Sequence, residues 1–210
     1  MPVVEPKLME IKGPTYGDFI MVLKGMPDSS FICNRMPEEV ALGIDEKRRG
    51  SETSIKVKKV SIDEAYEQST YRNSKGEFIY PSHKIKNAAI EAAKGKGWWE
   101  DMDGKRFKAA VQVVGEYVVI NGEPNKRKDI VFDKGRGGKI PTMRYRMELK
   151  DWQCDVRVKF NISLISQEQI IAVFNAAGFG IGIGDKTPEQ GYSNGMFSVT
   201  RLSAPPKTKE

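Results

Sequence analysis

Residues 166–202, SQEQIIAVFNAAGFGIGIGDKTPEQGYSNGMFSVTRL, combine a helix, a run of glycines and a short strand. Ser166 and Gln169 have the spacing of a capping box, in which each side chain accepts a backbone N–H at the start of a helix. Apolar residues then recur at the spacing of one helical face. They are Ile170, Ile171, Phe174 and Ala177. We therefore expect a helix that begins at Ser166 and ends at Gly178, and a final strand over residues 196–202.

The preceding residues predict further strands and a second helix. Runs that alternate in polarity, or are rich in β-branched and aromatic residues, cover residues 16–23, 55–62, 107–122 and 143–165. Segment 107–122 is expected to form strands around Gly115 and to end in the turn Asn121-Gly122. The even-numbered residues Cys154 to Phe160 are apolar and share one face of their strand. Tyr80-Pro81-Ser82 predicts the start of a helix with Ser82 as its N-cap.

The order strand, helix, strand, strand, helix, strand is that of a ferredoxin-like or RRM-like sandwich. We therefore expect an α+β fold with an antiparallel sheet, two main helices and a long inserted loop. A single RRM-like domain would cover residues 1–202, with insertions near 26–54 and 122–142. Residues 203–210 are expected to form a disordered tail.

Composition restricts the class of protein. The 210 residues are 39% hydrophobic and 30% charged, which is typical of a globular chain. No stretch approaches the ~20 apolar residues that cross a bilayer, and the N-terminus lacks the plan of a signal peptide. Cys33 and Cys154 lie far apart, and a single His cannot complete a zinc set with them. We expect free thiols, no metal, no small-molecule cofactor, no membrane partner and a cytoplasmic location, the host cytoplasm if the protein is viral.

The glycines of residues 180–184 precede Lys186, which invites comparison with a phosphate-binding loop. A Walker loop needs glycine directly before the lysine and a helix that starts there. Here Asp185 comes directly before the lysine, and Pro188 lies just beyond it. We therefore reject nucleotide hydrolysis.

Glycine alternates with Phe179, Ile181 and Ile183 in the same segment. We expect these apolar side chains to pack inward, which leaves bare backbone on the other edge and permits close approach of another backbone. A tight connection between helix and strand, packed on the core, explains the same pattern. Both interpretations remain open at this point.

The sequence NAAGFGIGIGDKTPEQGYSNGMFSVTRL, at residues 175–202, resembles the carboxy-terminal glycine-rich loop of the RAMP superfamily. These are the RRM-like backbone and processing subunits of CRISPR ribonucleoprotein complexes. The resemblance implies contact with RNA backbone for Gly180, Gly182, Gly184 and Lys186. IYPSHKIKNAAIEAA, at residues 79–93, is similar to the family's first helix, which implies that Ser82 and Lys84 face the RNA.

One departure from the family pattern is that His83 and Lys84 stand where the family commonly has small residues or glycine. His83 would be a general base in a metal-independent ribonuclease, but no orienting carboxylate lies near it in sequence. We therefore expect no catalytic residue and no enzyme. The pattern is also similar to uncharacterised phage proteins, so a phage-encoded relative is an alternative source.

Basic residues interleave with glycine and aromatic residues over positions 126–146. Lys and Arg neutralise phosphates, and aromatic rings stack on unpaired bases. A plain flexible hairpin would have much the same composition. The expected nucleic-acid-binding residues are Lys84, Lys126, Arg127, Lys128, Arg136, Lys139, Arg144, Gly180, Gly182, Gly184 and Lys186.

The sequence therefore favours a non-catalytic protein that binds single-stranded RNA or DNA through the phosphate backbone. The resemblance to RAMP subunits also implies self-association along the strand. The alternative is a protein-interaction or assembly component, such as a viral structural protein or inhibitor. Its basic loops would then meet an acidic protein partner.

Overall fold

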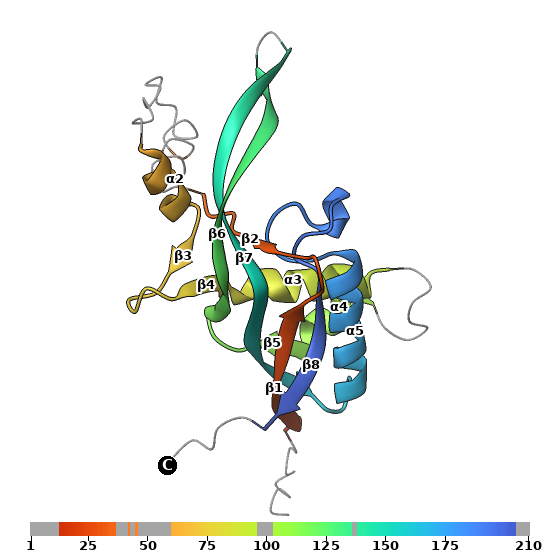
Figure 1. The fold of residues 1–210 in the computed structure, drawn as a ribbon. Helices are drawn as coiled ribbons and strands as arrows, with labels where there is room; N and C mark the ends of the chain where they lie inside the picture. The colour runs from red at the N-terminus through yellow and green to blue at the C-terminus, as the bar shows by residue number, and fades with distance from the viewer. Residues whose placement is uncertain are drawn as a thin grey trace, which may run out of the picture.

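The computed structural model describes residues 13–36, 42, 45, 60–95, 103–135 and 138–204. Figure 1 shows the arrangement of its elements. They are β1 (Tyr16–Gly25), β2 (Phe31–Ile32), α2 (Ile62–Gln68), β3 (Tyr71–Arg72), β4 (Phe78–Pro81), α3 (Ser82–Ala93), α4 (Gly104–Ala110), β5 (Val111–Val113), β6 (Tyr117–Gly135), β7 (Gly138–Asn161), α5 (Gln167–Gly180), the 3-10 helix η1 (Pro188–Gln190) and β8 (Phe197–Ser203).

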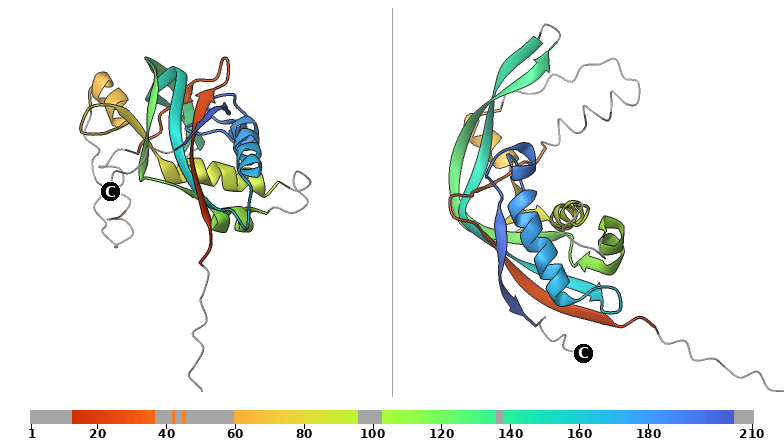
Figure 2. Two further views of the ribbon diagram at one scale, coloured as in Figure 1. Left: turned by 90° about the horizontal axis from the view of Figure 1, so that it is seen from below. Right: turned by 90° about the vertical axis from the view of Figure 1, so that its right-hand side faces the viewer.

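The described strands form one antiparallel sheet in the order β3, β4, β6, β7, β1, β8. Strands β2 and β5 also pair with β7, which is therefore the central strand. The sheet is curled, and helices α3, α4 and α5 lie on its concave side (Figure 2). The α+β class expected from the sequence is confirmed.

The alternation expected in β7 is present. Cys154, Val156 and Val158 are fully buried, and Phe160 is nearly so. Arg157 lies between them on the opposite face and forms an ion pair with Asp18 of β1 (Nη2 to Oδ2, 2.6 Å). Strand β7 therefore supplies one face of the core and carries charge on the other.

Helix α5 begins as expected, because the Ser166 and Gln169 side chains form both hydrogen bonds of the capping box. The expected end at Gly178 is wrong, since the helix continues to Gly180. Gly178 is instead a packing residue: a Cβ there would lie 1.9 Å from the carbonyl oxygen of Phe197 in β8. Glycine at this position lets the helix backbone approach the sheet.

Ser82 was expected at the N-cap of α3, but it is the first residue of the helix, and Pro81 occupies the N-cap position. The Ser82 hydroxyl does not cap its own helix but donates to the carbonyl oxygens of Gly115 and Glu116. The side chain therefore ties the start of α3 to the segment that leads into β6.

Two expectations for residues 107–122 are wrong. Residues 107–110 belong to α4, which Asp103 caps by accepting from the Arg106 N–H at 2.7 Å. Asn121-Gly122 is not a turn, because β6 continues through it with a bulge and pairs with β7 as far as Gly135 opposite Gly138. The insertion expected near residues 122–142 is therefore mostly a two-stranded ribbon. We call residues 123–135 and 138–150 the arm; it extends from the body at the top of Figure 1.

Several expectations lie partly outside the described residues. Of the strand expected over 55–62, residues 55–59 are not described, and Ile62 begins helix α2. The insertion near 26–54 contains β2, which pairs with Leu149 and Glu148 of β7, so this part is sheet. In the tail, Ser203 belongs to β8, and residues 205–210 are not described.

Candidate nucleic-acid interface

The Gly-rich loop, residues 181–196, is tied down by backbone hydrogen bonds to neighbouring elements. The Asp185 N–H donates to the Ile32 carbonyl at 3.1 Å, and the Gly195 N–H donates to the Ser30 carbonyl at 2.8 Å. The Gly184 N–H donates to the Tyr80 hydroxyl at 3.2 Å. The loop is therefore a fixed surface between β2 and α3.

The glycines of this loop serve its own packing. Gly182 and Gly184 have φ of 76° and 93°, a region that side chains with a Cβ rarely adopt. A Cβ on Gly184 would lie 2.7 Å from the Ile32 carbonyl oxygen. Ile183 is buried as expected, but Phe179 is 63% exposed, so the expectation that it packs inward is wrong. The geometry favours the tight-connection interpretation at both glycines.

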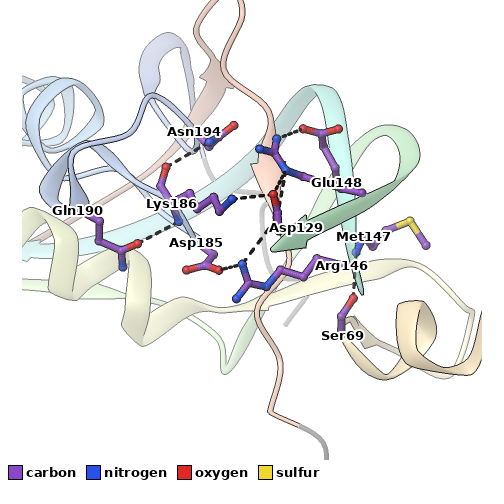
Figure 3. A network of polar contacts seen from close by, with 10 residues as sticks. Ser69, Asp129, Arg146, Met147, Glu148, Asp185, Lys186, Gln190 and Asn194 are labelled. Carbon is purple, nitrogen blue, oxygen red and sulfur yellow. Dashed lines mark hydrogen bonds and ion pairs between the residues drawn. The ribbon is translucent and has the colours of Figure 1, made fainter. Parts of the chain in front are cut away.

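The arm and the Gly-rich loop are joined by ionised side chains, which Figure 3 shows. Lys186 Nζ lies 2.6 Å from Asp129 Oδ1, and Arg146 pairs with Asp185. Arg127 contacts Asp129 (Nε to Oδ1, 3.2 Å) and Glu148 (Nη1 to Oε1, 2.9 Å). We call these six residues the arm–loop ion network.

Asp129 and Glu148 are buried, at 8% and 7% exposed, yet the pKa of each lies below its ordinary value. Burial acts to raise the pKa of Asp129, but hydrogen bonds from Lys186 and Arg127 outweigh it and hold the pKa below its ordinary value. Burial of Glu148 is likewise outweighed by hydrogen bonds from Asn125 and Arg127, which lower its pKa. Each buried carboxylate of the network is therefore paired with a basic side chain, and these pairs connect the arm to the Gly-rich loop.

Several side chains that were expected to bind phosphate already have a carboxylate partner within the chain. Lys186 and Arg127 are held by Asp129, and Lys126 is paired with Asp63 of α2. Each of these cations already has a carboxylate partner, which reduces its attraction for phosphate.

The other expected ligands of the arm differ among themselves. Lys128 is exposed, with its Nζ 5.9 Å from the centroid of the Tyr145 ring. Arg144 stands opposite Asp129 in the ladder. Arg136 lies outside the described residues, and of Lys139 only the backbone is described.

Lys84 has different surroundings. It is the third residue of α3, and its Nζ lies 5.5 Å from the Tyr80 ring centroid and 5.8 Å from that of Tyr71. Its hydrogen bond goes to Asn34 Oδ1, at 3.5 Å. Arg35 Cζ lies 5.7 Å from the same Tyr71 ring. We call Asn34, Arg35, Tyr71, Tyr80 and Lys84 the cation–aromatic cluster.

Within the part of the chain that the structure describes, neither Lys84 nor Arg35 forms an ion pair with a carboxylate. Arg35 donates instead to the Thr70 carbonyl at 3.4 Å. Burial lowers the pKa of the half-buried Lys84, because it removes water from the ammonium group. A desolvated cation without a counter-ion is a place where an anion binds favourably.

Lys84 lines a shallow groove of about 200 Å³ between α3 and the Gly-rich loop. Gly182 and Gly184 line the same groove, so the structure brings three of the expected ligands together. Glu91 also lines it and is paired with Lys94 (2.5 Å). Gly180 lies apart, exposed in the last turn of α5 with open space around it.

The sequence interpretation missed Asn34, Arg35 and Tyr71. Asn34 and Arg35 are separated from Lys84 by the undescribed residues, and Tyr71 is separated from it by the β3–β4 hairpin, so no spacing in the sequence connects them. The sequence offered one hint, which is that Tyr71 stands directly before Arg72. An aromatic residue next to a basic one is too common in strands to identify a site.

In the described ranges, no group of three or more His, Cys, Asp and Glu is placed to hold a metal ion. No described helix is both long enough and apolar enough to cross a membrane. Cys33 and Cys154 are free and buried, and burial raises the pKa of each to about 12. His83 is exposed on α3.

The fold is similar to that of two solved structures of Cmr proteins. The crystal structure of Cmr6 from Pyrococcus furiosus matches with a TM-score of 0.45 and 12% identity, over 89% of this chain and 99% of that one. A chain of the type III-B Cmr-beta complex bound to cognate target RNA matches with a TM-score of 0.37 and 11% identity, over 89% of this chain and 60% of that one. No family model and no curated protein sequence matches this chain.

Both TM-scores are below 0.5, and the similarity therefore gives no residue of this chain a function.

Proposed function

We propose that this chain binds a nucleic-acid strand without catalysis, through the cation–aromatic cluster and the exposed basic residues of the arm. The observation that carries the proposal is Lys84, a half-buried cation between two tyrosine rings with no carboxylate partner among the described residues. A phosphate group forms an ion pair with such a cation, and bases stack on aromatic rings beside it. The sequence resemblance to RAMP proteins favours RNA over DNA.

The strand order supports the ferredoxin-like part of the expectation. Without the short strands, the sheet reads β6, β7, β1, β8, which is second, third, first and fourth in chain order. Helix α3 precedes β6, and helix α5 joins β7 to β8. We propose that this ferredoxin-like or RRM-like core, in one domain, presents both binding regions.

A second candidate function is a protein-interaction role, and one observation favours it. Ile130 and Met143 face each other across the arm and are 61% and 44% exposed. An apolar pair beside Lys128 would suit an acidic protein surface or a second copy of the chain.

The test compares Lys84→Met with Lys75→Met, which removes an exposed lysine from the segment between β3 and β4. Affinity for labelled single-stranded RNA, single-stranded DNA and duplex is measured by fluorescence anisotropy. Lys84→Met should weaken strand binding about tenfold, because a charge-assisted contact contributes about 1.5–3 kcal/mol. The thermal midpoint of Lys84→Met should change little, because the loss of the Asn34 hydrogen bond and the ring contacts is offset by removal of a half-buried charge.

Equal affinities for the two variants would overturn the proposed role of Lys84. The strand should be recovered at full length after incubation, because catalysis is not expected. A wild-type chain that binds no nucleic acid and instead captures an acidic protein through Ile130 and Met143 would establish the second candidate function.

A further inference from the structure

Aromatic rings run in a row from the core to the surface and pass through the cation–aromatic cluster. The Phe31 ring centroid lies 5.7 Å from that of the buried Trp152 and 5.0 Å from that of Tyr80. Lys84 sits between Tyr80 and Tyr71, and the Tyr71 centroid lies 6.2 Å from that of Tyr117. The row ends at Tyr117, whose residue is 42% exposed.

The backbone that carries the outer rings is held in place. Tyr117 begins β6 opposite Pro81, directly before α3. The Ser82 N–H donates to the Glu116 carbonyl at 2.9 Å, which fixes the residue before Tyr117 to the first turn of that helix. Tyr71 pairs with Ile79 on the same β4 strand. An exposed ring on so fixed a backbone loses little freedom when it binds a flat partner.

The charges around the Tyr71 ring indicate the chemistry of the ligand. Lys84 and Arg35 both lie within 6 Å of the Tyr71 ring, which is next to Tyr117 in the row. A ligand with a flat aromatic group close to an anion would stack on the exposed ring and pair with the cations at the same time. A nucleotide in a single strand has both, whereas the bases of a duplex are stacked on each other and unavailable.

We infer that Tyr117, backed by Tyr71, is the stacking platform for one unpaired base of the strand whose phosphate Lys84 and Arg35 hold. The inference rests on the proposed function and deepens it, because it names the residue on which an unpaired base stacks. A ring that only covered the sheet edge would make no distinction between strands with and without bases.

The test uses two strands of equal length, an intact oligonucleotide and one in which abasic residues replace the bases. Wild type should bind the intact strand about tenfold more tightly, which is within the range of base stacking on one aromatic ring. Tyr117→Leu should lose this preference while its affinity for the abasic strand stays unchanged. Tyr117→Phe, which keeps the ring, should retain it.

Equal wild-type affinity for the two strands overturns the inference without any variant, and so does an unchanged preference in Tyr117→Leu. Lys84→Met separates this failure from that of the proposed function, because it should weaken binding of both strands alike. A wild-type chain that binds neither strand overturns both proposals.

Discussion

Lys84 and Lys186 carry the same ammonium group, but their neighbours give them different properties. Lys186 is paired with the buried Asp129, and its backbone carbonyl accepts from the Asn194 side chain at 3.2 Å. Lys84 has aromatic rings and an amide around it, with burial lowering its pKa. Both were expected to bind phosphate from the sequence, yet only Lys84 has the surroundings of an open anion site.

The loop glycines provide a prediction at the same scale. Gly182→Ala should lower the free energy of unfolding by about 1–2 kcal/mol, because its φ is positive and a Cβ would lie 2.7 Å from Pro188 Cδ. Gly180→Ala is the matched control: nothing lies within 4 Å of its Cβ, and it is helical, so it should gain about 0.5–1 kcal/mol. Urea unfolding of the two variants measures both. Equal stabilities would mean that the loop adjusts freely around Gly182.

Elements with a local signal could be predicted from the sequence, and elements that depend on distant contacts could not. The capping box of Ser166 and the alternation from Cys154 to Phe160 are properties of neighbouring residues, and both the start of helix α5 and the buried face of strand β7 were found as expected. Residues 122–142, which form most of the arm, were expected to be an inserted segment, and a flexible hairpin was one interpretation of their composition. What stabilises it is pairing between β6 and β7 and the ions that join it to the Gly-rich loop.

The candidate site divides in the same way. Lys84 and the loop glycines could be selected because their own segments resemble known motifs. Tyr71 and Tyr117 come close to Lys84 only through the pairing of β3 with β4 and of β4 with β6. Arg35 is held there by the hydrogen bond from its backbone N–H to the Ser69 carbonyl, at 3.0 Å. Register of this kind depends on cross-strand partners that no spacing along the chain encodes.

The link between arm and loop predicts a dependence of stability on pH. The folded pKa of Asp129 lies below its ordinary value of 3.8, so the link contributes fully above that value and is lost as pH falls through the folded pKa. Asp129→Asn should therefore lower the free energy of unfolding by about 2 kcal/mol near pH 7, where it removes the pairs to Lys186 and Arg127. The difference from wild type should shrink at acid pH.

Asp155→Asn serves as the control, because this aspartate is exposed on β7 and forms no ion pair within the described residues. Urea unfolding at several pH values compares the three chains. A difference between Asp129→Asn and wild type that stays constant down to acid pH would show that ionisation of Asp129 is not what stabilises the arm.

Positive charge is concentrated in two stretches of the sequence. Residues 122–146 hold eight Lys and Arg against three Asp and Glu, a net charge of +5, and residues 47–59 hold six against one, also +5, while the whole chain carries +6. The first stretch forms most of the arm. In the proposed function, the arm attracts the polyanion at long range, whereas the cation–aromatic cluster fixes where one nucleotide lies.

The salt dependence of strand binding distinguishes direct phosphate contacts of the arm from its long-range electrostatic attraction. Lys128 has an exposed charge and no carboxylate partner among the described residues, whereas Lys126 is paired with Asp63. If the proposed strand runs along the arm, Lys128→Ala should reduce the slope of log affinity against log salt by about 0.7, for all sequences alike, because one phosphate contact is lost. Lys126→Ala should change the slope less, since its ammonium already has a counter-charge. Titrations at several salt concentrations compare the two variants with wild type. Equal slopes in all three chains would place the strand on the cation–aromatic cluster and away from the arm.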